Sequence, residues 1–286
     1  ELSGMPGSES VVAEGPWTGS TLPELIGRFG AELLGKANYA RFGQEFPLLV
    51  KFIDAREDLS IQVHPDDELA RKRHGKSGKC EMWYVLEAEP GASLLTGFSR
   101  PIAPAEYERR VADNTLTDVL NRQAIASGDV FYLPAGRVHS IGKGSFIVEI
   151  QQSSDITYRI YDFDRRDAAG NSRELHTELA REAIDFESSE NSRITYAPEN
   201  NQEVRLVTTP YFTTSLYTLT ARTRCDWSAT DSFVAIVLLQ GSGSLTDNEG
   251  NRIDVRQGET WLLPASTQWT EITPHTATLR LLTSRI

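Results

Sequence analysis

Four polar residues in the sequence have the types and spacing of a metal-ligand set. Gln62 and His64 lie two positions apart in a segment predicted to be a strand, so their side chains point to the same face. Glu81 begins a second predicted strand, and His139 follows a tight turn at 134–136 that can return a second imidazole to the same point. Two imidazoles, a carboxylate and an amide oxygen suit a borderline divalent metal, and zinc is the usual choice when no redox chemistry is needed. We therefore expect one divalent ion per chain.

Two cations occur beside these residues in the sequence. Lys79 precedes Glu81 by two positions, so both side chains can face the same side of an extended segment. Arg159 follows the predicted strand that comes after His139. Spacing alone is weak support for a functional role, because most Lys and Arg side chains lie on the surface. No role is assigned to the remaining histidines, which are His74, His176 and His275.

The elements expected to position these residues are short strands separated by turn signals, a pattern typical of a sandwich or barrel. In the first half of the chain, strands are predicted over 47–53, 59–64, 81–86, 130–133, 145–151 and 157–161. In the second half they are predicted over 212–220, 233–239, 260–263 and 276–283. Helices are predicted to start at Ser20-Thr21 and to cover 66–73, 104–122 and 178–184.

An internal repeat indicates that one barrel occurs twice. The sequence Gly-Asp-Val-Phe-Tyr-Leu-Pro at 128–134 recurs as Gly-Glu-Thr-Trp-Leu-Leu-Pro at 258–264. Trp269 stands in the second copy where His139 stands in the first, so the second copy is expected to bind no metal. The predicted domains are therefore a metal-binding catalytic domain with helical segments at 1–161, a connecting segment at 162–201, and a degenerate, metal-free domain at 202–286.

Composition narrows the class of protein. The chain has 286 residues, of which 39% are hydrophobic and 24% charged, as in ordinary globular proteins. A net charge of −11 argues against a non-specific nucleic-acid surface, so an anionic substrate must be met by locally placed Lys or Arg. No apolar run approaches the roughly 20 residues of a membrane span. Cys80 and Cys225 form no disulfide framework, and no signal-peptide pattern is visible at Glu1. We expect a cytoplasmic protein that is monomeric or a weak homo-oligomer.

Longer motifs resemble a known family. The pattern from Gly128 through Pro134 and Gly136 to His139 is similar to the second cupin motif. Three segments resemble signatures of the type I mannose-6-phosphate isomerases, in their short bacterial branch: Ser-Ile-Gln-Val-His-Pro at 60–65, Gly-Lys-Cys-Glu-Met-Trp-Tyr-Val at 78–85, and the segment 151–162 that contains Ser-Asp-Ile-Thr-Tyr-Arg. The resemblance covers nearly the whole chain.

The resemblance implies a mainly β fold of two cupin (jelly-roll) barrels with a small helical insertion. It also implies a zinc-dependent interconversion of mannose 6-phosphate and fructose 6-phosphate through an enediol. Matched by motif, the metal ligands are Gln62, His64, Glu81 and His139. The catalytic positions implied by the same motifs are Lys79, Asp155 and Arg159. Cys80 departs from the family pattern beside the site without replacing a ligand.

The chemistry agrees with these residues. Negative charge develops on the sugar oxygens in the enediol step, and a fixed guanidinium such as Arg159 can stabilise it. The sequence leaves the base open among Lys79, Asp155 and a water molecule beside the metal. Two other functions share parts of this pattern: an iron cupin dioxygenase and a non-catalytic sugar-sensing cupin. The Gln62 ligand and the pair of Lys79 and Arg159 favour the sugar-phosphate isomerase.

Overall fold

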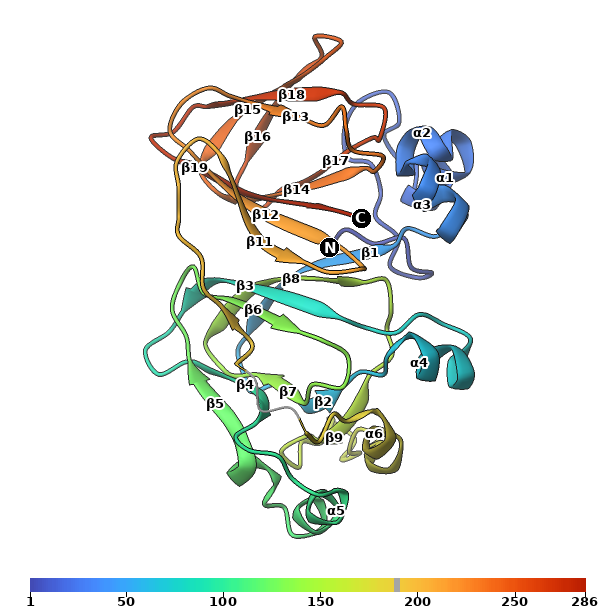
Figure 1. Cartoon of the computed structure of the whole chain (residues 1–286), viewed down its shortest axis with the longest axis vertical. Coiled ribbons are helices and arrows are strands. Elements are labelled where there is room, and N and C mark those ends of the chain that lie inside the picture. Colours follow the sequence, from blue (N-terminus) through green and yellow to red (C-terminus); the bar gives the residue numbers. More distant parts are fainter. Residues whose placement is uncertain (188–190) are drawn as a thin grey trace. The chain divides into compact units, whose positions relative to one another are not determined.

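The computed structural model covers residues 1–286 and describes all of them except 188–190 (Figure 1). The described chain is mainly β and divides into two compact units, Lys51–Ile194 and Glu1–Val50 together with Thr195–Ile286. This division differs from the predicted boundaries at 161 and 202, since the first 50 residues group with the C-terminal part of the chain. The contacts responsible are non-local: the backbone N–H groups of Lys36 and Ala37 donate to the carboxylate of Asp231, at 2.8 and 3.0 Å.

The Lys51–Ile194 unit is built on two five-stranded sheets (Figure 1). The first has the order β1 (Leu48–Ala55), β8 (Ser145–Gln152), β3 (Glu81–Ala88), β6 (Val130–Leu133), β10 (Arg193–Ile194). The second has the order β5 (Leu120–Ala124), β4 (Ser93–Phe98), β7 (His139–Ile141), β2 (Ile61–Val63), β9 (Tyr158–Tyr161). One buried cluster joins the two sheets, with Trp83 and Phe131 from the first and Leu94 and Ile141 from the second. The core of this unit therefore lies between its sheets.

Short helices cover the second sheet of this unit. They are α4 (Asp67–His74), α5 (Pro104–Ala112), the 3₁₀ helix η1 (Leu116–Val119) and α6 (Thr177–Ala183). Asp66 caps α4 by accepting a hydrogen bond from Leu69 N–H at 2.8 Å, as expected for an Asp at a helix start. A second buried cluster, which contains Val63, Tyr158 and Ala180, packs beneath these helices.

The other unit begins with α1 (Leu22–Phe29), α2 (Ala31–Leu34) and α3 (Lys36–Phe42). Thr21 and Glu24 form a capping box at α1, which confirms the predicted helix start. One sheet has the order β11 (Glu203–Thr208), β12 (Thr213–Leu219), β19 (Leu279–Arg285), β14 (Val234–Gln240), β17 (Thr260–Leu263). The other has the order β13 (Thr223–Asp226), β18 (Trp269–Pro274), β15 (Ser242–Asp247), β16 (Arg252–Arg256). A buried cluster again contains residues of both sheets, such as Ile236 and Ile272.

The repeated sequence segments adopt corresponding strands. β6 and β17 follow Gly128 and Gly258, whose φ values of 91° and 87° favour glycine. In the first unit β3 lies between β8 and β6, and in the second β14 lies between β19 and β17, with antiparallel pairing throughout. The repeat in the sequence therefore corresponds to the same arrangement of three neighbouring strands in each unit.

Two predicted segments differ from the structure. The helix predicted over 104–122 was wrong at its end, because Leu120–Ala124 is strand β5 and pairs with β4. The predicted connection 162–201 contains α6 and β10, and its residues 188–190 lie outside the described part of the chain. Among the residues that the structure describes, none of the helices has the length and apolar character needed to cross a bilayer.

Candidate metal centre and active site

Three of the predicted ligands meet between the two sheets of the Lys51–Ile194 unit. His139 begins β7 and pairs with Gln62 of β2, while His64 lies just beyond β2. Glu81 comes from β3 in the other sheet. His64 Nε2 and His139 Nε2 each lie 3.0 Å from Glu81 Oε1. The side chains of His64, Glu81 and His139 are 2%, 0% and 2% exposed.

Both histidines place Nδ1 beside a backbone carbonyl oxygen and Nε2 beside the carboxylate of Glu81. His64 Nδ1 lies 2.7 Å from the carbonyl oxygen of Ile156, and His139 Nδ1 lies 2.8 Å from that of Arg137. A carbonyl only accepts, so both Nδ1 atoms carry a proton, and in the neutral form of each ring the Nε2 atom is the bare one that can bind a cation. Burial, together with Lys79, lowers the pKa of His64 to about 3, so this ring is neutral at neutral pH.

This arrangement fits a cation. His64 Nε2 and both oxygens of Glu81 are buried without a hydrogen-bond partner. Three electron-rich atoms that converge without a proton between them repel one another unless a positive charge lies there. The candidate ligand atoms of His64, Glu81 and His139 all lie within 4.8 Å of one another. The donor set and its orphaned atoms therefore suit a divalent metal ion.

Gln62 reaches the same cluster. Its side-chain nitrogen lies 3.3 Å from His139 Nε2, and its oxygen accepts from the Ser60 hydroxyl at 3.4 Å. An amide nitrogen is not a metal ligand, so Gln62 can join the set only with the amide rotated to exchange its oxygen and nitrogen. The two rotamers occupy the same space, and a cation in the cluster favours the one that presents oxygen.

Lys79 lies beside Glu81, as its spacing predicts. Its Nζ is 3.7 Å from Glu81 Oε2, and the side chain is 6% exposed. Burial alone would raise the pKa of Glu81, but the neighbouring Lys79 outweighs it and holds that pKa well below its usual range. Gly78 brings Lys79 close to the start of α4, because a Cβ at Gly78 would lie only 2.4 Å from the backbone of Asp66. A glycine is therefore required immediately before the lysine.

Arg159 belongs to the same face of the sheet as Gln62. The two residues are partners in the antiparallel pairing of β2 and β9, and such partners point to the same side. Its guanidinium donates through Nη1 to the carbonyl oxygen of Glu174 at 2.9 Å, while its buried Nε has no partner. Burial and the nearby Arg173 lower the pKa of Arg159. Arg159 thus retains a donor for a further ligand.

Asp155 is placed differently from the buried ligands. Its side chain is 56% exposed and is bound by Lys76 Nζ at 2.9 Å. The hydrogen bond from Lys76 lowers the pKa of Asp155, which makes this carboxylate a weaker base. Asp155 is therefore suited to accept hydrogen bonds from a ligand more than to carry a proton.

Two charged residues of the buried site were missed in the sequence. Glu149 of β8 accepts a hydrogen bond from Trp83 Nε1 at 3.0 Å, and Lys51 of β1 lies 3.9 Å from it. Burial and the neighbouring Glu81 carboxylate raise the pKa of Glu149 to about 8, so this side chain can carry a proton at neutral pH. The signal was a charged residue in the middle of an otherwise apolar strand.

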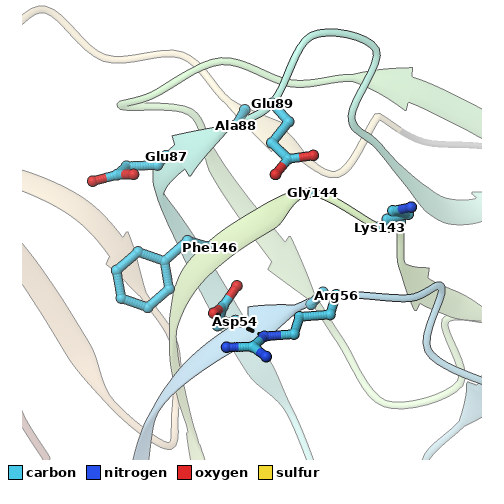
Figure 2. Close-up of a pocket in the computed structure, with 9 residues that line it drawn as sticks. Asp54, Arg56, Glu87, Ala88, Glu89, Lys143, Gly144 and Phe146 are labelled. Carbon is cyan, nitrogen blue, oxygen red and sulfur yellow. Dashed lines mark ion pairs between the residues drawn. The ribbon is translucent and has the colours of Figure 1, made fainter.

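A separate hollow of about 350 Å³ lies near the C-terminal ends of β1 and β3 (Figure 2). Its lining includes Asp54 near the end of β1, Arg56 just after that strand, Glu87 and Glu89 near the end of β3, and Lys143. The charges are of both signs, and Asp54 and Arg56 form an ion pair at 3.9 Å with both side chains largely exposed. Glu81 lies at the opposite end of β3. This hollow has no buried, unpartnered polar atom and is not a candidate for catalysis.

The C-terminal unit has no equivalent of the ligand cluster. Trp269 begins β18 as His139 begins β7, and its ring is covered by the guanidinium of Arg224 at 4.1 Å. Within the described part of the chain, the group of His, Cys, Asp and Glu side chains that could hold a metal ion consists of His64, Glu81 and His139. Cys80 and Cys225 are both free and buried.

Comparisons with known proteins agree with this geometry. A family profile described as phosphomannose isomerase type I, catalytic domain, matches residues 4–96. A mannose-6-phosphate isomerase of Streptococcus mutans is 34% identical over 264 residues, which is 92% of this chain and 81% of the relative. A mannose-6-phosphate isomerase of Bacillus subtilis is 35% identical over 260 residues, which is 90% of this chain and 79% of the relative.

Solved structures give the same result. The crystal structure of mannose 6-phosphate isomerase from Bacillus subtilis matches with a TM-score of 0.88 and 31% identity, over 100% of this chain and 88% of that one. A variant of phosphomannose isomerase from Salmonella typhimurium matches with a TM-score of 0.77 over 99% of this chain and 89% of that one. At 16% identity, this second match supports the fold alone.

Proposed function

The chain belongs to the type I phosphomannose isomerases, and on that premise we propose that it interconverts mannose 6-phosphate and fructose 6-phosphate. The observation that carries the proposal is the buried convergence of two imidazole Nε2 atoms on the carboxylate of Glu81, whose oxygens have no hydrogen-bond partner. Such a site serves a cation, and the relatives named above are mannose-6-phosphate isomerases.

Four residues would hold one divalent ion, which we propose is zinc: His64, Glu81, His139 and, with its oxygen turned inward, Gln62. A nitrogen and oxygen donor set suits this metal, and isomerisation needs no change of redox state. When bound, the ion supplies a Lewis acid that stabilises negative charge on the sugar oxygens.

The protein side chains supply the remaining chemistry of an aldose–ketose isomerisation, in which a proton moves between C2 and C1. The Arg159 Nε–H is a fixed, partly desolvated donor that can stabilise the developing enediolate. Lys79 is a buried cation beside the ligands and can donate to the sugar or phosphate oxygens. Asp155, exposed and with a lowered pKa, is suited to accept from sugar hydroxyls at the rim. For the exchange of the proton we propose Lys79 and Glu149, which are buried beside Glu81.

We also propose that each unit is a cupin (jelly-roll) barrel and that only the first is catalytic. The supporting observations are the repeated strand order, the presence of two sheets in each unit and a buried cluster shared between the sheets of each. Trp269, under Arg224, removes the ligand that His139 provides in the first unit.

The proposed setting is the cytoplasm, with the protein as a monomer or weak homo-oligomer. Two free, buried cysteines suit a reducing compartment, where sugar phosphates are also found. The partner is a small sugar phosphate, and the net charge of −11 disfavours nucleic acid.

A coupled assay for fructose 6-phosphate tests the function. Wild-type protein should convert mannose 6-phosphate, lose activity on chelation and recover it when zinc is returned, because the site needs its cation. The same samples are tested for oxygen uptake and for sugar-phosphate binding without turnover. Oxygen consumption would point to an iron dioxygenase, and binding alone would point to a sensing protein. Full isomerase activity after complete chelation would contradict the metal dependence.

A further inference from the structure

A short segment, 174–176, covers the free edge of β9 beside Arg159. β9 is the last strand in its sheet, so its outer backbone groups need partners. His176 N–H donates to the carbonyl oxygen of Arg159 at 2.7 Å, and the Arg159 N–H donates to His176 Nδ1 at 3.3 Å. Both outward peptide groups of Arg159 are therefore bound by His176, one through its backbone and the other through its ring.

The same segment also holds the side chain of Arg159. The carbonyl oxygen of Glu174, two residues before His176, accepts from Arg159 Nη1 at 2.9 Å. A carbonyl orients the guanidinium without neutralising it. The buried Nε–H remains without a partner. The segment thus leaves a charged donor free on the face that carries Gln62.

Asp162, which follows β9, pairs with arginines other than Arg159. Asp162 is buried, and its carboxylate is bound by Arg165 and by Arg173, whose Nε lies 2.7 Å from Oδ2. Among the described residues, Arg159 forms no ion pair with a carboxylate. The negative charge of Asp162 is satisfied by two other arginines, and the charge of Arg159 is left for a ligand.

We propose that His176 is a positioning residue, which pins segment 174–176 to β9 and so fixes the Arg159 guanidinium toward the substrate. This inference rests on the isomerase function proposed above. His176 acts through Arg159 and has no role in holding the metal. A substitution of His176 can remove the hydrogen bond accepted by its ring nitrogen, while the hydrogen bond donated by its backbone N–H remains.

Two substitutions at His176 separate the ring nitrogen from the bulk of the ring. His176→Ala removes the acceptor and should lower kcat for mannose 6-phosphate by about tenfold or more, since small displacements of a positioned group are costly to turnover. His176→Asn retains an acceptor at nearly the same place as Nδ1 and should recover most of the loss. Metal content should be unchanged in both. His74→Ala is the matched control, because the rings of His74 and His176 both lie against Tyr158, with ring centroids 5.9 and 6.4 Å from it, but His74 has no hydrogen bond to Arg159.

A double-mutant cycle tests whether the effect passes through Arg159. Arg159→Lys removes the planar fork that the Glu174 carbonyl holds. In that background, His176→Ala should cause little further loss of kcat, because the two residues act as one unit. An equal fractional loss in both backgrounds, or no loss from His176→Ala in the wild type, would overturn the proposal and leave His176 with a structural role.

Hydrogen exchange provides a measurement that does not depend on activity. The amide of Arg159 should exchange faster in His176→Ala than in the wild type or in His176→Asn, because its acceptor is gone. Unchanged exchange would remove the proposed link. If the wild-type protein lacked isomerase activity, the proposed function would fail, whereas faster exchange would still show that His176 holds Arg159.

Discussion

Lys79 and Arg159 lie beside the ligand cluster, and neither can bind a metal ion while protonated, because each then has donors only. Lys79 Nζ is 3.7 Å from Glu81 Oε2, and Arg159 is the strand partner of Gln62. We therefore expect their contribution to be made to the substrate. This difference allows catalysis to be separated from metal binding by substitution.

We predict that Lys79→Met and Arg159→Lys each keep the metal but lose roughly two orders of magnitude in turnover, the scale of one preorganised electrostatic donor. Metal stoichiometry, kcat and KM are measured for both. Lys143→Met is the control for the lysine, because Lys143 is exposed at the hollow shown in Figure 2. Turnover near that of the wild type in both variants, with metal intact, would refute these roles.

The kinetic parameter that changes identifies what Arg159 binds. A loss confined to kcat means that the guanidinium acts on the enediolate, whereas a rise in KM means that it holds the phosphate. The orphaned Nε–H on the face of Gln62 favours the first result.

At the scale of single residues, the sequence predicted which polar side chains converge better than it predicted their surroundings. The i, i+2 spacing of Gln62 and His64 and the offset of Lys79 from Glu81 were enough to bring these side chains together. Glu149 and Lys51 could not be found in this way, because each interrupts an apolar strand whose neighbours across the sheet are fixed only by folding. The ion pair of Asp155 with Lys76 was likewise invisible.

At the scale of elements, the loop after β9 depends on Asp162. Burial alone would raise the pKa of Asp162, but hydrogen bonds from Arg173 and Arg165 hold it below its ordinary value. A carboxyl whose pKa is lower in the folded chain stabilises the fold above its unfolded pKa of about 3.9. That stabilisation is lost as the pH falls through the lower, folded-state pKa.

Asp162→Asn should therefore lower the free energy of unfolding at neutral pH by about 1–3 kcal/mol, the range for hydrogen bonds to charged groups. The difference from the wild type should shrink as the pH falls below about 4, where the carboxyl of the unfolded chain begins to be protonated, and should vanish as the pH falls through the lower, folded-state pKa. Urea unfolding at several pH values measures it. Asp164→Asn is the control, since Asp164 is exposed and its φ of 52° is tolerated by Asn. A difference that stayed constant down to pH 2 would show that charge is not the cause.

Strand prediction succeeded where the pattern was local and strong. β6 and β17 have the bounds read from the sequence, and α1 begins at its capping box. The pattern did not identify β5, because Leu120 is the one buried residue of this strand and its pairing with β4 is a tertiary contact. The helix predicted to continue to residue 122 failed for the same reason.

At the scale of the whole molecule, the repeat predicted two similar units but not their composition. Residues 1–50 group with Thr195–Ile286, and the contacts that bring them together include those of Lys36 and Ala37 with Asp231, residues far apart in the sequence. A domain boundary that depends on contacts between residues far apart in the sequence cannot be read from local amino-acid composition. The loss of a ligand at Trp269, by contrast, was readable directly from the aligned repeats.

Metal content and fructose 6-phosphate formation, measured on the same preparations of wild type, His139→Ala and Trp269→Ala, test the central claim that one cation held by His64, Glu81 and His139 is required for isomerisation. We predict about one zinc-class ion per wild-type chain, as for a single closed ligand set. His139→Ala should lose most of both metal and activity while keeping the wild-type circular dichroism, and Trp269→Ala should keep its metal. A His139→Ala protein with full metal and full turnover would contradict the account.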